Sequence, residues 1–177
     1  RPGGLLRMPD GVTPVIVGDL HANLDNLLKV LSENACLESL ERGDAGLIIL
    51  GDAVHPQADG ALTQMDTSLL MLDLICMLKI RYPRNVFYIR GNHDSFDLLV
   101  SKAGILQGVL LKNWARQLRG RRYMEELEEF FELLPYVART RDFIACHGGP
   151  PRGDATLSDL VNIRSRERLA LEIVWNR

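Results

Sequence analysis

Short runs of apolar, mostly β-branched residues alternate along the chain with stretches in which leucines recur at helical spacing. The runs Pro14–Val17 and Gly46–Leu50 have the length and composition of buried strands. The leucines between these runs that share one helical face are Leu24, Leu27, Leu28 and Leu31. We therefore predict a strand–helix–strand unit in which the leucine face packs on a sheet.

The same alternation continues in the middle of the chain. A longer helix is predicted over about 63–80, stopped by Pro83, and it leads into a strand over 85–89. Ser95 is expected to cap the next helix. Three glycines are expected to break the following region into shorter helices, and these are Gly104, Gly108 and Gly120.

The last third of the chain begins with an amphipathic helix that ends at Pro135. Its apolar face consists of Tyr123, Leu127, Phe130, Phe131 and Leu134. The segments 136–140 and 143–146 flank Arg141–Asp142 and predict a β-hairpin. Strands that alternate with helices in this way are typical of a layered α/β or α+β fold.

Composition narrows the class of protein without identifying a function. The 177 residues are enough for one domain, and 46% hydrophobic with 25% charged residues is ordinary globular usage. The net charge of −2 gives no reason to expect general nucleic-acid or membrane-surface binding. The longest apolar stretch, 68–80, is shorter than the roughly 20 residues of a membrane span. Three scattered cysteines form no disulfide pattern, which favours a reducing, cytoplasmic setting.

Residues that can bind metal ions stand at the ends of the predicted strands. Asp19 and His21 follow the first run and Asp52 follows the second. Asn92 follows the third run, and His147 ends the hairpin. Each of these strand ends also has a glycine next to one of the named residues, which permits a sharp turn. One such turn is usually only a turn or a helix cap, but four of them in order predict a shared metal site beyond the strand ends.

These motifs, GDLH, GD, GNHD and HGG, resemble those of the calcineurin-like metallophosphoesterases. They are most similar to a bacterial-type variant of the phosphoprotein phosphatase (serine/threonine phosphatase) branch. The segment Leu133-Leu134-Pro135 before the hairpin and Trp175 shortly after the last helix extend the resemblance over nearly the whole chain. The resemblance implies a sandwich of mixed β-sheet flanked by helices, incomplete at its C-terminus.

The resemblance also implies roles for individual residues. The implied ligands are Asp19 and His21 for a first metal ion, Asp52 for both ions, and Asn92 and His147 for a second. A hydroxide between the two ions would attack phosphorus, and His93 would protonate the leaving oxygen as general acid. Carboxylate, amide and imidazole ligands without cysteine suit manganese, iron or zinc, of which we favour manganese.

Two departures from the family pattern change the expected substrate contacts. Where the family continues Gly-Asp with an acid and a phosphate-binding arginine, this chain has His55 and Pro56. His55 is therefore a candidate to contact substrate phosphate, to pair indirectly with His93, or to be an exposed loop residue. Asn92 and Arg90 are further substrate-binding candidates, although we expect Arg90 mainly to support its loop.

The second departure is the absence of any histidine after His147, which leaves the second metal ion one family ligand short. We therefore expect residues 1–177 to be the N-terminal and central part of a longer metallophosphoesterase domain.

Three functions remain open from the sequence. The first is hydrolysis of a phosphorylated protein side chain, and the second is hydrolysis of a nucleotide such as a dinucleoside polyphosphate. The third is a weakly active module that senses phosphate or binds a partner, because the second motif is altered and a ligand is missing. The oligomeric state does not follow from the sequence.

Overall fold

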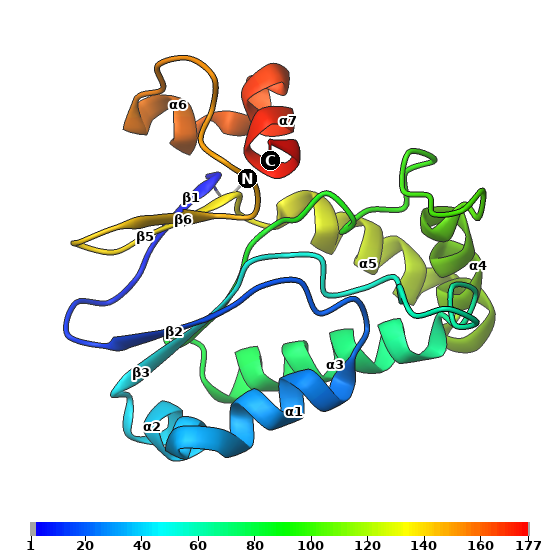
Figure 1. Cartoon of the computed structure of the whole chain (residues 1–177), viewed down its shortest axis with the longest axis horizontal. Coiled ribbons are helices and arrows are strands. Elements are labelled where there is room, and N and C mark those ends of the chain that lie inside the picture. Colours follow the sequence, from blue (N-terminus) through cyan, green and yellow to red (C-terminus); the bar gives the residue numbers. More distant parts are fainter. Residues whose placement is uncertain (1–2, 177) are drawn as a thin grey trace.

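A parallel sheet lies at the centre of the computed structural model, which describes residues 3–176 (Figure 1). Its order is β2-β3-β4, formed by β2 (Thr13–Val17), β3 (Ala45–Ile49) and β4 (Val86–Tyr88). Val15 pairs with Leu47, and Leu47 pairs with Val86. All three strands were predicted, and their parallel pairing places the three carboxyl ends at one edge.

A second sheet lies over the first and has mixed strand directions. Its order is β1-β5-β6, formed by β1 (Leu5–Arg7), β5 (Val137–Arg139) and β6 (Ile144–Cys146). β1 runs parallel to β5, whereas β5 and β6 form the predicted antiparallel hairpin. The mixed β-sandwich expected from the sequence is confirmed.

Helices cover the outer sides of the two sheets (Figure 1). Those against the parallel sheet are α1 (Leu24–Ser32), α2 (Cys36–Arg42) and α3 (Asp66–Arg81), with a 3₁₀ turn over Glu33–Ala35. The helices that follow β4 are α4 (Gln107–Arg119) and α5 (Arg121–Leu133). Above the mixed sheet lie α6 (Leu157–Val161), a 3₁₀ turn over Ile163–Ser165 and α7 (Glu167–Trp175).

The alternation of side chains along β3 divides the hydrophobic core. Every residue of β3 is buried. Leu47 and Ile49 belong to the large cluster on the helix side, whereas Ile48 packs with Ala138 of the opposite sheet. Successive residues of a strand point to opposite faces, so one strand fills both layers. A third cluster, which includes Val137 and Ile173, joins the mixed sheet to α7.

Several local predictions were wrong at the level of single residues. Ile16 of β2 is 48% exposed because β2 is an edge strand, so β2 is not fully buried. Ser95 caps no helix: its hydroxyl accepts from Asp97 N, and α4 begins only at Gln107. Gly108 lies inside α4, whereas Gly120 does separate α4 from α5. Trp175 is the last residue of α7 and does not follow it.

No helix among residues 3–176 is long and apolar enough to cross a bilayer.

Candidate metal centre

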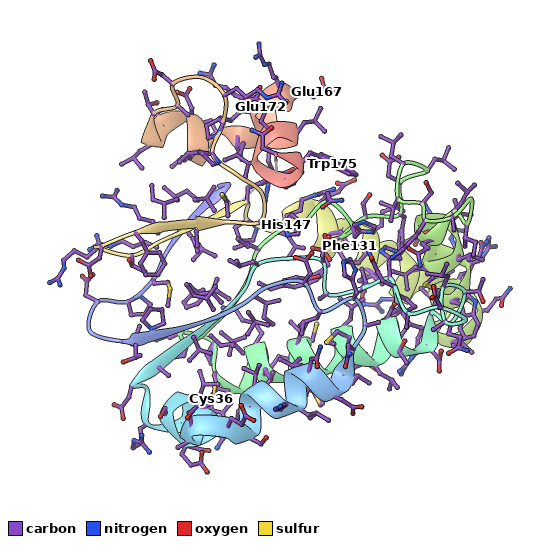
Figure 2. The ribbon with its side chains drawn as sticks, in the orientation of Figure 1. Cys36, Phe131, His147, Glu167, Glu172 and Trp175 are labelled. Carbon is purple, nitrogen blue, oxygen red and sulfur yellow. The ribbon has the colours of Figure 1, made fainter. Side chains whose placement is uncertain are left out.

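Four segments that are far apart in the sequence meet at one edge of the parallel sheet. Three of them are the turns that follow β2, β3 and β4, whose carboxyl ends lie together because the strands are parallel. The fourth is the end of β6, where Figure 2 labels His147 beside these turns. The site is therefore built from both sheets.

The turns after β3 and β4 touch each other at two glycines. Gly51 has a φ of 103°, and a Cβ atom at this position would overlap the backbone of Gly91. A Cβ atom at Gly91 would in turn overlap the carboxylate of Asp52. Only residues without a side chain allow this approach, and Asp52 itself is held at a φ of 49° between the two turns.

The turn after β2 is attached to the same point through the backbone. The N–H groups of Leu20 and His21 both donate to the carbonyl of Asp52, at 3.1 and 2.8 Å. Ala22 N donates to the carbonyl of Ala53 at 2.7 Å. These bonds hold Asp19 and His21 beside Asp52.

Ligand atoms of the first three motif residues lie close together. His21 Nε2 is 3.7 Å from Asp19 Oδ2 and 3.9 Å from Asp52 Oδ2. Asp19, Asp52 and His147 each contribute an atom to a group within 4.8 Å of one another. Carboxylates and imidazoles at this spacing can share a metal ion.

His147 connects the mixed sheet to this group. Its Nδ1 lies 2.9 Å from the carbonyl of Leu50, which can only accept, so Nδ1 carries a proton. In the neutral ring, Nε2 then presents a lone pair to Asn92 Oδ1 at 2.8 Å and to Asp52 Oδ2 at 3.4 Å. Three electron-pair donors thus point at one another, an arrangement that a cation between them stabilises.

The remaining polar atoms agree with a bound cation. Asp52 is fully buried, and its Oδ2 has no hydrogen-bond partner among residues 3–176. Burial, and then the charge of Asp94, raise the pKa of Asp52 to about 6, against the lowering effect of His147, the His93 N–H and His21. A metal ion at Oδ2 would favour the ionised form and offset this desolvation. The donor set therefore fits a divalent cation.

His93 lies beside the ligand group and is held by its backbone. Its N–H donates to Asp52 Oδ1 at 2.7 Å. Its ring meets His21 edge to face, with centroids 5.2 Å apart, and lies 5.9 Å from the ring of His55. The backbone hydrogen bond fixes His93 next to the Asp52 carboxylate, and its imidazole lies beside the rings of His21 and His55.

His55 is fully buried, so the alternative that it is an exposed loop residue is wrong. Its backbone has a φ of 65°, and its N–H donates to Ser68 Oγ at 3.0 Å. Burial, followed by the neighbouring imidazoles of His93 and His21, lowers the pKa of His55 to about 3. The ring is neutral near pH 7 and presents no accessible surface to a phosphate.

The family described as Calcineurin-like phosphoesterase matches residues 13–177. The chain belongs to this family.

Relatives within the calcineurin-like phosphoesterases include named phosphatases. "Serine/threonine-protein phosphatase with EF-hands 1" of Mus musculus is 30% identical over 135 residues, which are 76% of this chain and 18% of that protein. "Serine/threonine-protein phosphatase PP2A-like PPG1" of Saccharomyces cerevisiae is 30% identical over 172 residues, 93% of this chain and 42% of that protein. The chain therefore spans less than half the length of these curated relatives.

A solved structure shares the fold of this calcineurin-like phosphoesterase. It is a protein serine/threonine phosphatase from Saccharomyces cerevisiae with similarity to human phosphatase PP5. The TM-score is 0.69 at 22% sequence identity, over 98% of this chain and 53% of that one. This likeness shows the fold alone.

Arg90 lies at the border between the metal centre and a neighbouring cleft. Its Nη1 donates to the carbonyl of Phe131 at 2.8 Å, and its guanidinium lies 5.8 Å from the Tyr136 ring centroid. Both contacts attach the turn after β4 to its surroundings. Arg90 also lines a cleft of about 590 Å³, together with Asn92, Tyr136, Arg164 and Trp175.

Two residues with a structural role in the calcineurin-like site were missed by sequence reasoning. Asp94 is fully buried and accepts hydrogen bonds from Asp52 N at 2.9 Å and Gly91 N at 2.8 Å. Gln107, also buried, donates from Nε2 to the carbonyls of Pro56 and Leu62 and so anchors the loop after His55. The acid ending the GNHD motif was a visible signal for Asp94, whereas nothing in the sequence marks Gln107.

The contact between the two glycine turns predicts a difference between two glycine substitutions. Gly51 and Gly60 both have positive φ, but only Gly51 has a neighbouring backbone where a Cβ atom would lie. Gly60→Ala should lower the free energy of unfolding by about 1 kcal/mol, through backbone strain alone. Gly51→Ala adds steric overlap and should lower it by about 3 kcal/mol or more. Urea unfolding of both metal-free variants measures the two free energies of unfolding. Equal losses would show that the fold does not depend on contact between the two turns.

Proposed function

We propose that this chain carries the catalytic centre of a metal-dependent phosphoprotein phosphatase, which hydrolyses phosphate esters of serine and threonine side chains. The main support is the convergence of ligand atoms from Asp52, Asn92 and His147 at one buried point. Membership of the calcineurin-like phosphoesterases and the named phosphatases among the relatives support the same reaction class.

Two divalent cations would be held by the residues of the four motifs. Asp19 and His21 would bind one ion, Asn92 and His147 the other, and Asp52 both. Bound ions of this kind acidify water and neutralise charge on phosphoryl oxygens. The mixed oxygen and nitrogen donors suit manganese, iron or zinc, and manganese is the ion that we propose to test first.

His93 would act as the general acid of the reaction. Its N–H bond to Asp52 Oδ1 holds the residue beside the metal centre, and its ring lies edge to face against that of His21. A protonated imidazole at this position could transfer its proton to the leaving oxygen of serine or threonine. Alkoxide leaving groups require such protonation, because they are poor leaving groups on their own.

His55 would position His93 and would not touch the substrate. The buried neutral ring of His55 lies with its centroid 5.9 Å from that of the His93 ring. The substrate would instead meet Asn92 and the adjoining cleft lined by Arg90, Tyr136 and Trp175. A cleft with both cationic and aromatic walls can accommodate the residues around a phosphorylated side chain.

The first experiment measures phosphate release by manganese-loaded protein from a serine phosphopeptide, an aryl phosphate and a dinucleoside polyphosphate in parallel. We expect release from the phosphopeptide and the aryl phosphate. Asp52→Asn and Asn92→Ala should each lower phosphate release by more than about a hundredfold. Loss of a group that only supports a metal ligand costs about 10- to 100-fold, and loss of the ligand itself should cost more.

Matched controls for these variants are Asp10→Asn and Asn113→Ala, which change exposed residues outside the site. Both should behave like the unchanged protein. Hydrolysis of the dinucleoside polyphosphate alone would assign the site to nucleotides. Metal binding without turnover of any substrate would assign the chain to phosphate sensing or partner binding and contradict the proposal.

A separate prediction concerns the leaving group. His93→Asn should lower turnover of the phosphoserine peptide by about 10²- to 10⁴-fold, because an alkoxide needs a proton. Turnover of a nitrophenyl phosphate should fall much less, because that leaving group departs as an anion. Metal content, measured by atomic emission, should not change. An equal loss for both substrates would argue against His93 as the acid.

A further inference from the structure

We propose that Asp94 and Tyr88 form a positioning pair that holds the turns after β3 and β4 in their metal-binding arrangement. The inference rests on the metal site of the proposed function, but it assigns a role to two residues outside the set of ligands. Asp94 is not among the carboxylates whose oxygens group with His147. It acts through Asp52 and Gly91.

The carboxylate of Asp94 joins the two turns at the point where they touch. One oxygen, Oδ2, accepts from Asp52 N at 2.9 Å and from Gly91 N at 2.8 Å. These donors belong to different turns, so a single acceptor atom fixes their separation. Asp52 needs this support because its φ of 49° lies in the left-handed region, which residues with a side chain rarely adopt.

Tyr88 fixes the other oxygen of the same carboxylate. The Tyr88 hydroxyl donates to Asp94 Oδ1. Tyr88 is the last residue of β4, is 7% exposed, and packs against Phe130 of α5 with ring centroids 6.0 Å apart. The donor is therefore anchored to the sheet and to the aromatic core, and it sets the orientation of the carboxylate from a rigid element.

The Tyr88 hydroxyl keeps its proton near neutral pH. Burial and the adjacent Asp94 raise the pKa of Tyr88 well above its usual value. The role that we assign to Asp94 is that of its hydrogen bonds, which Asp94→Asn keeps while it removes the charge. This distinction can be tested.

The experiment measures the affinity of metal-free protein for Mn²⁺ by calorimetric titration, in the unchanged protein and in four variants. Tyr88→Phe deletes one donor and should weaken binding about tenfold, and Asp94→Ala deletes the acceptor and should weaken it about a hundredfold. Asp94→Asn keeps an oxygen for both N–H groups and an amide for Tyr88, so binding should stay within about threefold. The control Tyr82→Phe removes the hydroxyl of a half-buried tyrosine that donates to Glu41 outside the four motifs, and it should change nothing.

A double-mutant cycle separates positioning from general destabilisation. If Tyr88 acts through Asp94, Tyr88→Phe should change Mn²⁺ affinity by less than about twofold in the Asp94→Ala background. The inference would be overturned if the losses of Tyr88→Phe and Asp94→Ala were additive in the double variant. It would also be overturned by a Tyr88→Phe affinity equal to that of Tyr82→Phe, or by an Asp94→Asn loss as large as that of Asp94→Ala. Should Asp94→Ala fail to fold, the Tyr88→Phe comparison with Tyr82→Phe decides alone.

The titration also separates this inference from the proposed function. Failure of the unchanged protein to bind Mn²⁺ would refute the metal site on which both depend. Normal binding with no release of phosphate would refute the phosphatase activity, while the affinities of the variants would still decide the role of Tyr88 and Asp94. Normal binding that Tyr88→Phe leaves intact would refute the positioning pair alone.

Discussion

The site depends on the contact between the turn after β3 and the turn after β4. Gly51 and Gly91 permit it, because a side chain at either position would overlap the opposite turn. The contact leaves Asp52 in a left-handed conformation, in which both its backbone and its carboxylate form hydrogen bonds. Its carbonyl accepts from the turn after β2, its N–H donates to Asp94, and one carboxylate oxygen accepts from His93. The oxygen that remains faces His147 and is available to a cation.

The second requirement is a fixed spacing between the two sheets. His147 reaches the group from the mixed sheet, whereas the other proposed ligands follow strands of the parallel sheet. The apolar layer between the sheets, which includes Ile48 and Ala138, sets this spacing through close packing. The donor set is therefore a property of the sandwich, because neither sheet alone supplies it. All four histidines of the chain, His21, His55, His93 and His147, take part in this cluster of contacts.

The sequence predicted most of the elements that position the site. The apolar runs that form β2, β3 and β4, the leucine stripe of α1 and the hairpin of β5 and β6 carry strong local signals. Features that depend on contacts between distant segments were not predictable. Burial of His55 follows from the packing of its loop on Ser68 and Gln107, and the role of Asp94 follows from the meeting of two turns. The helix expected after Ser95 fails because the hydroxyl closes a local turn on Asp97 instead. Local patterns thus located the proposed ligands, whereas the residues that hold them could be recognised only in three dimensions.

The central claim is that four motifs form one site for two metal ions around Asp52. The most direct test is a crystal structure of the manganese-loaded protein with anomalous scattering recorded above and below the manganese absorption edge. The account predicts two anomalous peaks that both contact Asp52, one beside Asp19 and His21 and the other beside Asn92 and His147. Manganese peaks elsewhere, or none in contact with Asp52 at saturating manganese, would contradict it.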